Sequence, residues 1–156
     1  MENTWASGAC ELLRHADSHI GLDTAFDKRI AFISIDNSVE TSIRTFLSLP
    51  ESKSGIKVTR RERDDAENSF PKNLALLFKH AGTRLPGIDE GDIEHYHRIR
   101  NTLYHDGTGL SVDQQYLDAY RSIAAILLQN LFGVAVPTAD AEAPTLERLI
   151  LNWNTI

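Results

Sequence analysis

The sequence predicts an all-α protein, folded as an antiparallel bundle of five to six helices. Apolar residues recur at helical spacing almost throughout the 156 residues, and no segment alternates as a half-buried strand does. Hydrophobic residues form 42% of the chain, which is enough for one core. The links between helical segments are mostly short, which favours antiparallel neighbours. We expect a single domain over residues 1–156, with a core over 1–133 and a C-terminal linker and short helix over 134–156.

The first half of the chain is expected to hold two helices and a loop. Residues 2–19 and 23–49 carry apolar residues at helical spacing. Pro50 ends the second helix, because the residue before a proline disfavours helical backbone. Residues 51–68 are polar and have no period. We expect a loop there, with at most a short extended piece at Ile56–Val58.

Two helices with recognisable starts follow. Ser69 and Pro71 form a start signal for a third helix, which Gly82 ends. A fourth helix is expected over about 90–106, and it has acidic residues in its first turn, where they interact favourably with the helix dipole.

The C-terminal part is expected to hold one long helix and one short one. Ser111 and Gln114 fit a capping box for a fifth helix, which Gly133 ends. After a Pro/Ala-rich connection, a short apolar helix is expected near 145–153. That helix, which contains Trp153, would either cover the bundle or dock a partner.

Charge is spread unevenly along the chain. The formal net charge is −6, which disfavours tight coating of long nucleic-acid duplex, because such binding depends on neutralising phosphates. Residues 53–105 contain 10 of the 16 Lys and Arg residues but 8 of the 22 acidic residues, a balance of +2. This segment is either a solvated charged surface or a surface that engages a short stretch of phosphodiester.

Cysteine usage and the lack of long apolar runs suggest a soluble, cytoplasmic protein with no membrane contact. Cys10 is the single cysteine, so the chain cannot form an internal disulfide, and a reducing compartment is the simplest setting. The N-terminal residues lack the basic and apolar regions of a signal peptide. No apolar run approaches the ~20 residues that a membrane span needs.

The stretch "HRIRNTLYHDGTG", residues 97–109, contains the candidate site. On a helical wheel, Tyr96, Ile99 and Leu103 share one side, which is expected to pack on the bundle. The opposite arc holds His97, Arg100, Asn101, Tyr104 and His105. Lys, Glu and Gln would be more typical of a face that only meets solvent, so this arc is a candidate for chemistry.

These side chains match what RNA cleavage without a metal requires. The 2′-hydroxyl must lose a proton and the leaving 5′-oxygen must gain one, and the imidazole pKa of about 6.5 suits both tasks. A planar, permanently charged arginine can bind the phosphorane through two hydrogen bonds. Arg100 and His105 supply one cation and one imidazole. A two-fold dimer that brings two copies of this helix together would supply both an acid and a base.

Residues 100–105, Arg-Asn-Thr-Leu-Tyr-His, resemble the R-(N/H/D)-x-x-x-H signature of HEPN domains. These are all-helical bundles found in prokaryotic toxins, anti-phage systems and RNA-guided CRISPR effectors. The wider phrase "RNTLYHDGTGLSVD" and the earlier "SIDNSVETSIRTFL", with Glu40, extend the resemblance over most of residues 1–133.

The resemblance implies a metal-independent endoribonuclease that acts as a homodimer in a toxin or anti-phage defence role. Arg100 and His105 would be catalytic, Asn101 would position them, and no cofactor would be needed. The products would carry a 2′,3′-cyclic phosphate and a 5′-hydroxyl. The implied partners are single-stranded or structured RNA, a second copy of the chain, and an antitoxin or defence-system protein. A toxin subgroup has H-x-Y here, and Gly107 in place of that Tyr disfavours control by adenylylation.

Several other residues keep alternative roles open. His97 would contact substrate or lie at an interface, and a metal site is disfavoured because His95 and His97 are only two residues apart. Glu40 is either a surface acid or the partner of a basic residue of the fourth helix. Tyr104 would stack on a base or pack at the dimer interface. For the whole protein, the alternatives are a non-catalytic RNA-binding or dimerisation module and a regulatory subunit of a larger assembly.

Overall fold

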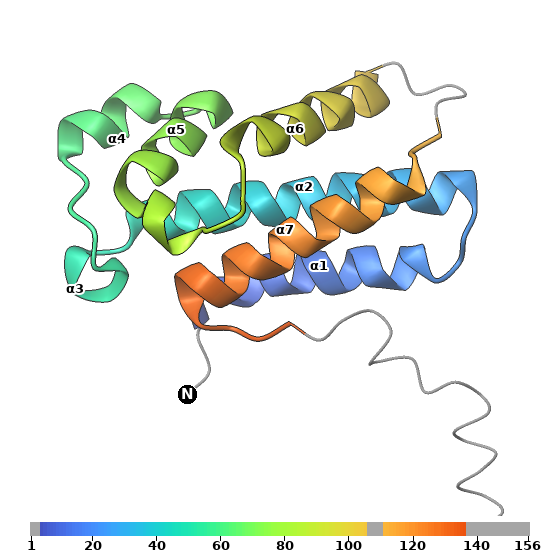
Figure 1. The fold of residues 1–156 in the computed structure, drawn as a ribbon, viewed down its shortest axis with the longest axis horizontal. Helices are drawn as coiled ribbons and strands as arrows, with labels where there is room; N and C mark the ends of the chain where they lie inside the picture. The colour runs from blue at the N-terminus through green and yellow to red at the C-terminus, as the bar shows by residue number, and fades with distance from the viewer. Residues whose placement is uncertain (1–3, 106–110, 137–156) are drawn as a thin grey trace, which may run out of the picture.

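The computed structural model describes residues 4–105 and 111–136, with residue 105 described by its backbone alone. Within these ranges the chain is helical and has no strand, which confirms the predicted all-α class. The long helices α1 (Ser7–Ile20), α2 (Ala25–Ser48), α6 (Glu90–His105) and α7 (Gln114–Phe132) lie side by side (Figure 1). α1 and α6 run in one direction and α2 and α7 in the other. α2 contacts the other three and also α5 (Phe70–Ala81), and its contacts with α1 and α7 are the most extensive in the bundle, so it is the central helix.

The first two helices begin and end close to the predicted limits. A 3-10 turn, η1 (Thr4–Ala6), precedes α1, which therefore begins a little later than expected. At the start of α2, the hydroxyl oxygen of Thr24 accepts a hydrogen bond from the backbone N–H of Asp27. α2 ends at Ser48, just before Pro50, as predicted.

The segment 51–68, predicted to be a loop, contains two short helices. These are α3 (Glu51–Ser54) and α4 (Arg60–Ala66). Ile56–Val58 lies between them and forms no strand, although Ile56 is buried. The loop prediction was wrong because neither helix is long enough to show an apolar repeat.

A cap and a contact with the next helix hold α4 in place. The hydroxyl of Thr59 accepts a hydrogen bond from the backbone N–H of Glu62, which caps the helix start. The Glu62 carboxylate lies 2.5 Å from Nε2 of His80, which belongs to α5 (Phe70–Ala81). Ala66 is buried at the other end of α4. α4 therefore depends on a partner 18 residues away in the chain.

The starts of α5 and α7 show where capping predictions succeed and fail. The hydroxyl of Ser69 accepts from the backbone N–H of Lys72, and α5 ends just before Gly82, as the signals predicted. A 3-10 turn, η2 (Gly82–Arg84), follows it. The capping box at Ser111 is wrong. Asp113, the residue next to the helix, accepts from the N–H of Gln115 at 2.8 Å instead.

The end of α7 agrees with the prediction. Gly133 closes the helix with a φ of 70°, a left-handed conformation that glycine adopts without a steric penalty. The helix expected near 145–153, with Trp153, lies outside the described residues.

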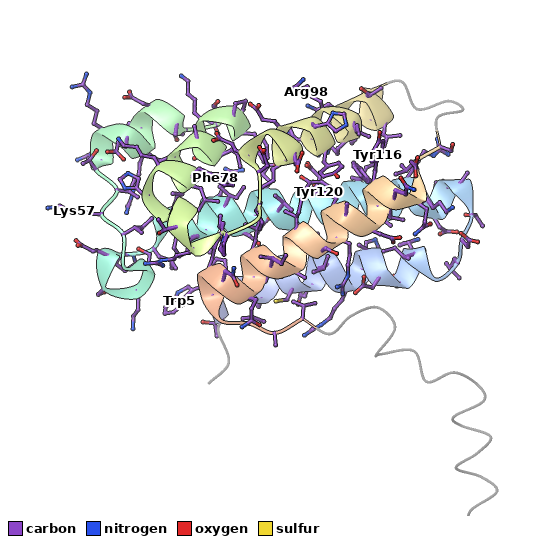
Figure 2. The ribbon with its side chains drawn as sticks, in the orientation of Figure 1. Trp5, Lys57, Phe78, Arg98, Tyr116 and Tyr120 are labelled. Carbon is purple, nitrogen blue, oxygen red and sulfur yellow. The ribbon has the colours of Figure 1, made fainter. Side chains whose placement is uncertain are left out.

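Aromatic side chains of α2, α6 and α7 meet in the core. Tyr120 projects from α7 toward α6 (Figure 2), and its ring lies 4.9 Å from that of Tyr96 and 5.3 Å from that of Phe32, between ring centroids. Phe32 and Tyr120 are completely buried. None of the helices described over 4–105 and 111–136 combines the length and the apolarity that a membrane span requires.

Replacing Phe32 by alanine is expected to lower the free energy of unfolding by about 3–5 kcal/mol, since it leaves a cavity between three packed helices. Phe26→Ala, in the same helix, is the matched control because its side chain is 59% exposed, and its effect should stay below about 1 kcal/mol. Urea unfolding followed by circular dichroism measures both. Equal losses in the two variants would contradict the packing described above.

The Glu62–His80 contact makes stability depend on pH. The hydrogen bond from His80 lowers the pKa of the Glu62 carboxyl below its ordinary value. A lowered pKa adds stability above the unfolded-state pKa, and that contribution is lost as the pH falls through the folded-state pKa. Between about pH 6 and about pH 3, Glu62→Gln should therefore lose less stability than the wild type. Glu11→Gln, at an exposed position of α1, should follow the wild-type curve.

Candidate active site around Arg100

The motif helix α6 presents more than one face to the rest of the fold. Ile93 and Leu103 are buried and Tyr96 and Ile99 are partly buried against the core, which confirms the predicted packing side. The arc predicted to lie opposite is divided. His97 and Arg100 turn toward α2 and are largely buried, with 16% and 21% of their side chains exposed, whereas Tyr104 is 64% exposed. The simple two-sided wheel failed because α6 contacts α2, α5 and α7.

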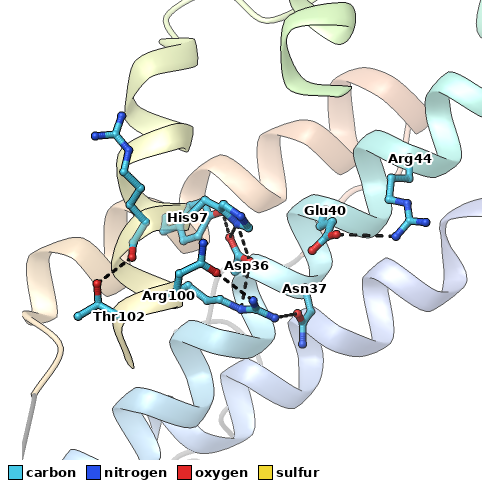
Figure 3. A network of polar contacts seen from close by, with 10 residues as sticks. Asp36, Asn37, Glu40, Arg44, His97, Arg100 and Thr102 are labelled. Atoms are coloured by element: carbon cyan, nitrogen blue, oxygen red, sulfur yellow. Dashed lines mark hydrogen bonds and ion pairs between the residues drawn. The ribbon is translucent and has the colours of Figure 1, made fainter. Parts of the chain in front are cut away.

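A completely buried carboxylate in α2 joins α6 to α7. Asp36 is 0% exposed and accepts a hydrogen bond of 2.6 Å from the Tyr120 hydroxyl. Nδ1 of His97 lies 3.0 and 3.1 Å from its two oxygens, and Nε of Arg100 lies 3.5 Å from Oδ2 (Figure 3). A buried carboxylate is tolerated only when donors or cations surround it, and α6 and α7 supply them here.

The guanidinium of Arg100 is fixed mainly by neutral groups. Its Nη1 donates to Oδ1 of Asn101 at 3.1 Å, and its Nη2 donates to Oδ1 of Asn37 at 3.2 Å. Its Nε is buried and makes no hydrogen bond within the described residues. The Tyr104 ring lies beneath it, with Cζ 5.2 Å from the ring centroid. Amide oxygens hold the two terminal nitrogens of this cation, while the carboxylate of Asp36 lies 3.5 Å from its Nε. Asn101 contacts the arginine that it was expected to position.

The imidazole of His97 is held on two sides. Its ring stacks on that of Phe70, the first residue of α5, with centroids 3.8 Å apart and 16° between the planes. Its Nδ1 faces Asp36. His97 therefore lies where α5, α6 and α2 meet, while His95 turns to the rings of Tyr96 and Tyr116.

Glu40 does not pair with α6. Its carboxylate lies 3.7 Å from Nη1 of Arg44, one turn further along α2 (Figure 3). Of the two roles left open for Glu40, pairing with a basic residue of the fourth helix is therefore wrong. Glu40 still acts on the cluster at a distance. Burial, followed by the charge of Asp36, raises the pKa of Tyr120 well above its ordinary value, and the charge of Glu40 adds to this effect. Tyr120 therefore stays a hydrogen-bond donor.

His105 occupies the last position of α6, and its side chain lies outside the described residues, as do residues 106–110 with Gly107. In the described part of the chain, no group of three or more His, Cys, Asp or Glu residues is arranged to hold a metal ion.

Asp36, Asn37 and Tyr120 were not predicted as site residues. A signal for Asp36 was present, since it lies four residues after Phe32 and three before Val39 and so shares their apolar face of α2. An acidic residue on a buried face needs partners. The sequence could not show which residues these partners are, because His97 and Tyr120 follow Asp36 by 61 and 84 residues.

Two hollows lie away from the cluster. One, of about 160 Å³, lies over α2, α4 and α5, and its lining residues include Arg44, Arg63, Leu47 and Leu76. The other, more open, lies between α4 and α5. Neither is lined by a residue that contacts Asp36 or Arg100.

No family model matches this chain, and comparisons with curated proteins and with solved structures found no match. The likeness to HEPN domains thus rests on the motif of residues 100–105, on the sequence phrases around it and around Glu40, and on the place of the motif at the end of a long helix.

Tyr120→Phe is expected to lower the free energy of unfolding by about 1–3 kcal/mol, because it removes a donor from the buried Asp36 carboxylate. Tyr116→Phe, on the same helix and 41% exposed, should change it by less than about 0.5 kcal/mol. Urea unfolding at neutral pH compares the two. If the two losses were alike, Asp36 would not depend on the Tyr120 hydroxyl.

Proposed function

We propose that this protein is a metal-independent endoribonuclease of the HEPN type, with a composite active site in a two-fold dimer and a role as a toxin or in anti-phage defence. The observation that carries the proposal is the fixed and partly exposed guanidinium of Arg100. Its guanidinium is fixed by two amide oxygens, retains part of its surface, and lies about one and a half turns before His105.

Arg100 has donors left for a phosphate. Each terminal nitrogen of a guanidinium carries two N–H groups, and each of these nitrogens donates to one amide oxygen. The second N–H of each can bind the two oxygens that gain charge as the 2′-oxygen attacks phosphorus. Because the side chain is already fixed, little reorganisation is needed when that charge develops.

A second protomer would complete the site. In the proposed reaction the 2′-hydroxyl gives up a proton and the 5′-oxygen receives one, so one His105 from each protomer would supply the base and the acid. The opposite wall of the substrate cleft is assigned to the partner protomer, since the proposed reaction takes one His105 from each chain. Tyr104, which is 64% exposed beside Arg100, would stack on a base or pack on that partner.

A non-catalytic RNA-binding or dimerisation module is the second candidate. The observation that favours it is also Arg100, since 79% of a charged side chain is buried and tied to α2, an arrangement that can serve stability alone. Such a module would bind RNA, or form the dimer, without cleaving.

The decisive comparison is cleavage by matched variants in EDTA. Wild type should cleave mixed cellular RNA and leave 2′,3′-cyclic phosphates and 5′-hydroxyls. Arg100→Ala should lower the rate by about 10²–10³ and His105→Ala by about 10²–10⁴, because charge stabilisation and proton transfer are lost. Arg100→Lys should also be slow, since it keeps the charge but not the paired donors.

Arg98→Ala is the control, because Arg98 lies on the same helix, pairs with Glu94 and has 73% of its side chain exposed. It should cleave like the wild type, and circular dichroism should show all variants folded. RNA binding without cleavage by folded wild type would replace the enzyme proposal with the binding module.

A further inference from the structure

We propose that His97, held by Asp36, is a second proton-transfer residue within the same protomer as Arg100, and that it acts as the base toward the 2′-hydroxyl. This inference rests on the proposed ribonuclease function. In this scheme His97 takes the role of base that was given above to one of the two His105 residues. The base and the cation that binds the phosphate would then come from one chain.

The contact with Asp36 sets which nitrogen of His97 carries the proton. Both carboxylate oxygens lie within 3.1 Å of Nδ1, and an ionised carboxylate can only accept hydrogen bonds. Nδ1 is therefore the donor. In the neutral imidazole the remaining nitrogen, Nε2, then has the free electron pair that a base needs.

Asp36 is itself fixed, so the imidazole has a defined orientation. The carboxylate is completely buried and receives the Tyr120 hydroxyl at 2.6 Å. The Phe70 ring lies flat against the imidazole at 3.8 Å and limits its rotation. This arrangement has a base, a carboxylate that orients it and a third group that orients the carboxylate.

Nε2 of His97 remains available to a substrate. It has no hydrogen-bond partner within the described residues, yet it is not among their buried, unpartnered polar atoms. It therefore reaches solvent, consistent with the 16% exposure of the side chain. A histidine that only stabilised the fold would not need this nitrogen to be exposed.

His97 and Arg100 lie next to one another. Oδ2 of Asp36 contacts both Nδ1 of His97, at 3.1 Å, and Nε of Arg100, at 3.5 Å, and the two residues are about one turn apart on α6. A phosphate bound to Arg100 would thus lie close to the imidazole. The charged or titratable groups around His97 come from three helices: Asp36 from α2, Arg100 from α6 and Tyr120 from α7. Glu40 lies one turn beyond Asp36 on α2. The residue that α5 places against the imidazole, Phe70, is uncharged.

The step balances as a proton transfer. Nε2 of His97 takes the proton of the 2′-hydroxyl as that oxygen forms its bond to phosphorus. The bond from phosphorus to the 5′-oxygen breaks, and this oxygen takes a proton from His105. His97 ends protonated beside Asp36, His105 ends neutral, and exchange with water restores both.

The first test needs no RNA. Nitrogen-15 NMR of the labelled protein distinguishes the two imidazole tautomers, and neutral His97 is expected as the Nδ1–H form. Asp36→Asn should raise the Nε2–H fraction, because an amide can present either its oxygen or its N–H₂ group to Nδ1. An Nε2–H tautomer in the wild type would overturn the proposal.

The second test separates base from acid. His97→Gln should lower the cleavage rate by about 10²–10⁴, and His95→Gln, at an exposed position two residues away, should leave it unchanged. An RNA with sulfur in place of the bridging 5′-oxygen has a leaving group that needs no acid. On this substrate His105→Ala should recover activity and folded His97→Gln should not.

The outcomes distinguish the two proposals. Cleavage of ordinary RNA by His97→Gln at the wild-type rate would overturn the assignment of His97 and leave the ribonuclease standing. Recovery of His97→Gln on the sulfur substrate would make His97 the acid and overturn its role as base. Failure of the wild type to cleave would overturn both proposals.

Discussion

The buried carboxylate of Asp36 is the constraint on which the centre of this fold depends. An ionised group without exposure to water needs donors in fixed positions, and Asp36 obtains them from α6 and α7. The apolar contacts among these helices could tolerate small shifts, whereas hydrogen bonds of 2.6 and 3.0 Å cannot. The polar cluster therefore sets the register of α2, α6 and α7.

The same constraint places the proposed chemistry. His97 and Arg100 are drawn toward α2 by Asp36 and Asn37, so the groups that would act on a phosphate are also groups that hold α6 in position. Removing either side chain leaves a buried partner on α2 without its contact, so replacing it affects folding as well as the proposed chemistry. A fixed cation and a fixed imidazole lose little freedom on binding a substrate, and this preorganisation favours catalysis.

The periphery follows a different rule. α4 is short and polar, and it is held by the Thr59 cap and by the Glu62–His80 contact instead of an apolar face. Isolated helices of this length are unstable in water, so contacts with α5 must supply the stability. This is why the polar segment 51–68 gave no helical signal, and why the limits of α5, which has both a cap and an apolar repeat, were predicted correctly.

What the sequence by itself determined is local. Apolar spacing, Pro50 and the residues around Ser69 and Gly133 set the class and most helix limits, because these effects act within a few residues. The proximity of Arg100 and Asn101 was also predictable, since the two residues are consecutive in the chain. Only the tertiary structure decided that Asp36 would join His97, Arg100 and Tyr120, and that Glu40 would face Arg44. It also decided that His97 and Arg100 would turn inward while Tyr104 stayed exposed. Those pairings join residues far apart in the chain, and helical spacing has no information about which helix packs on which.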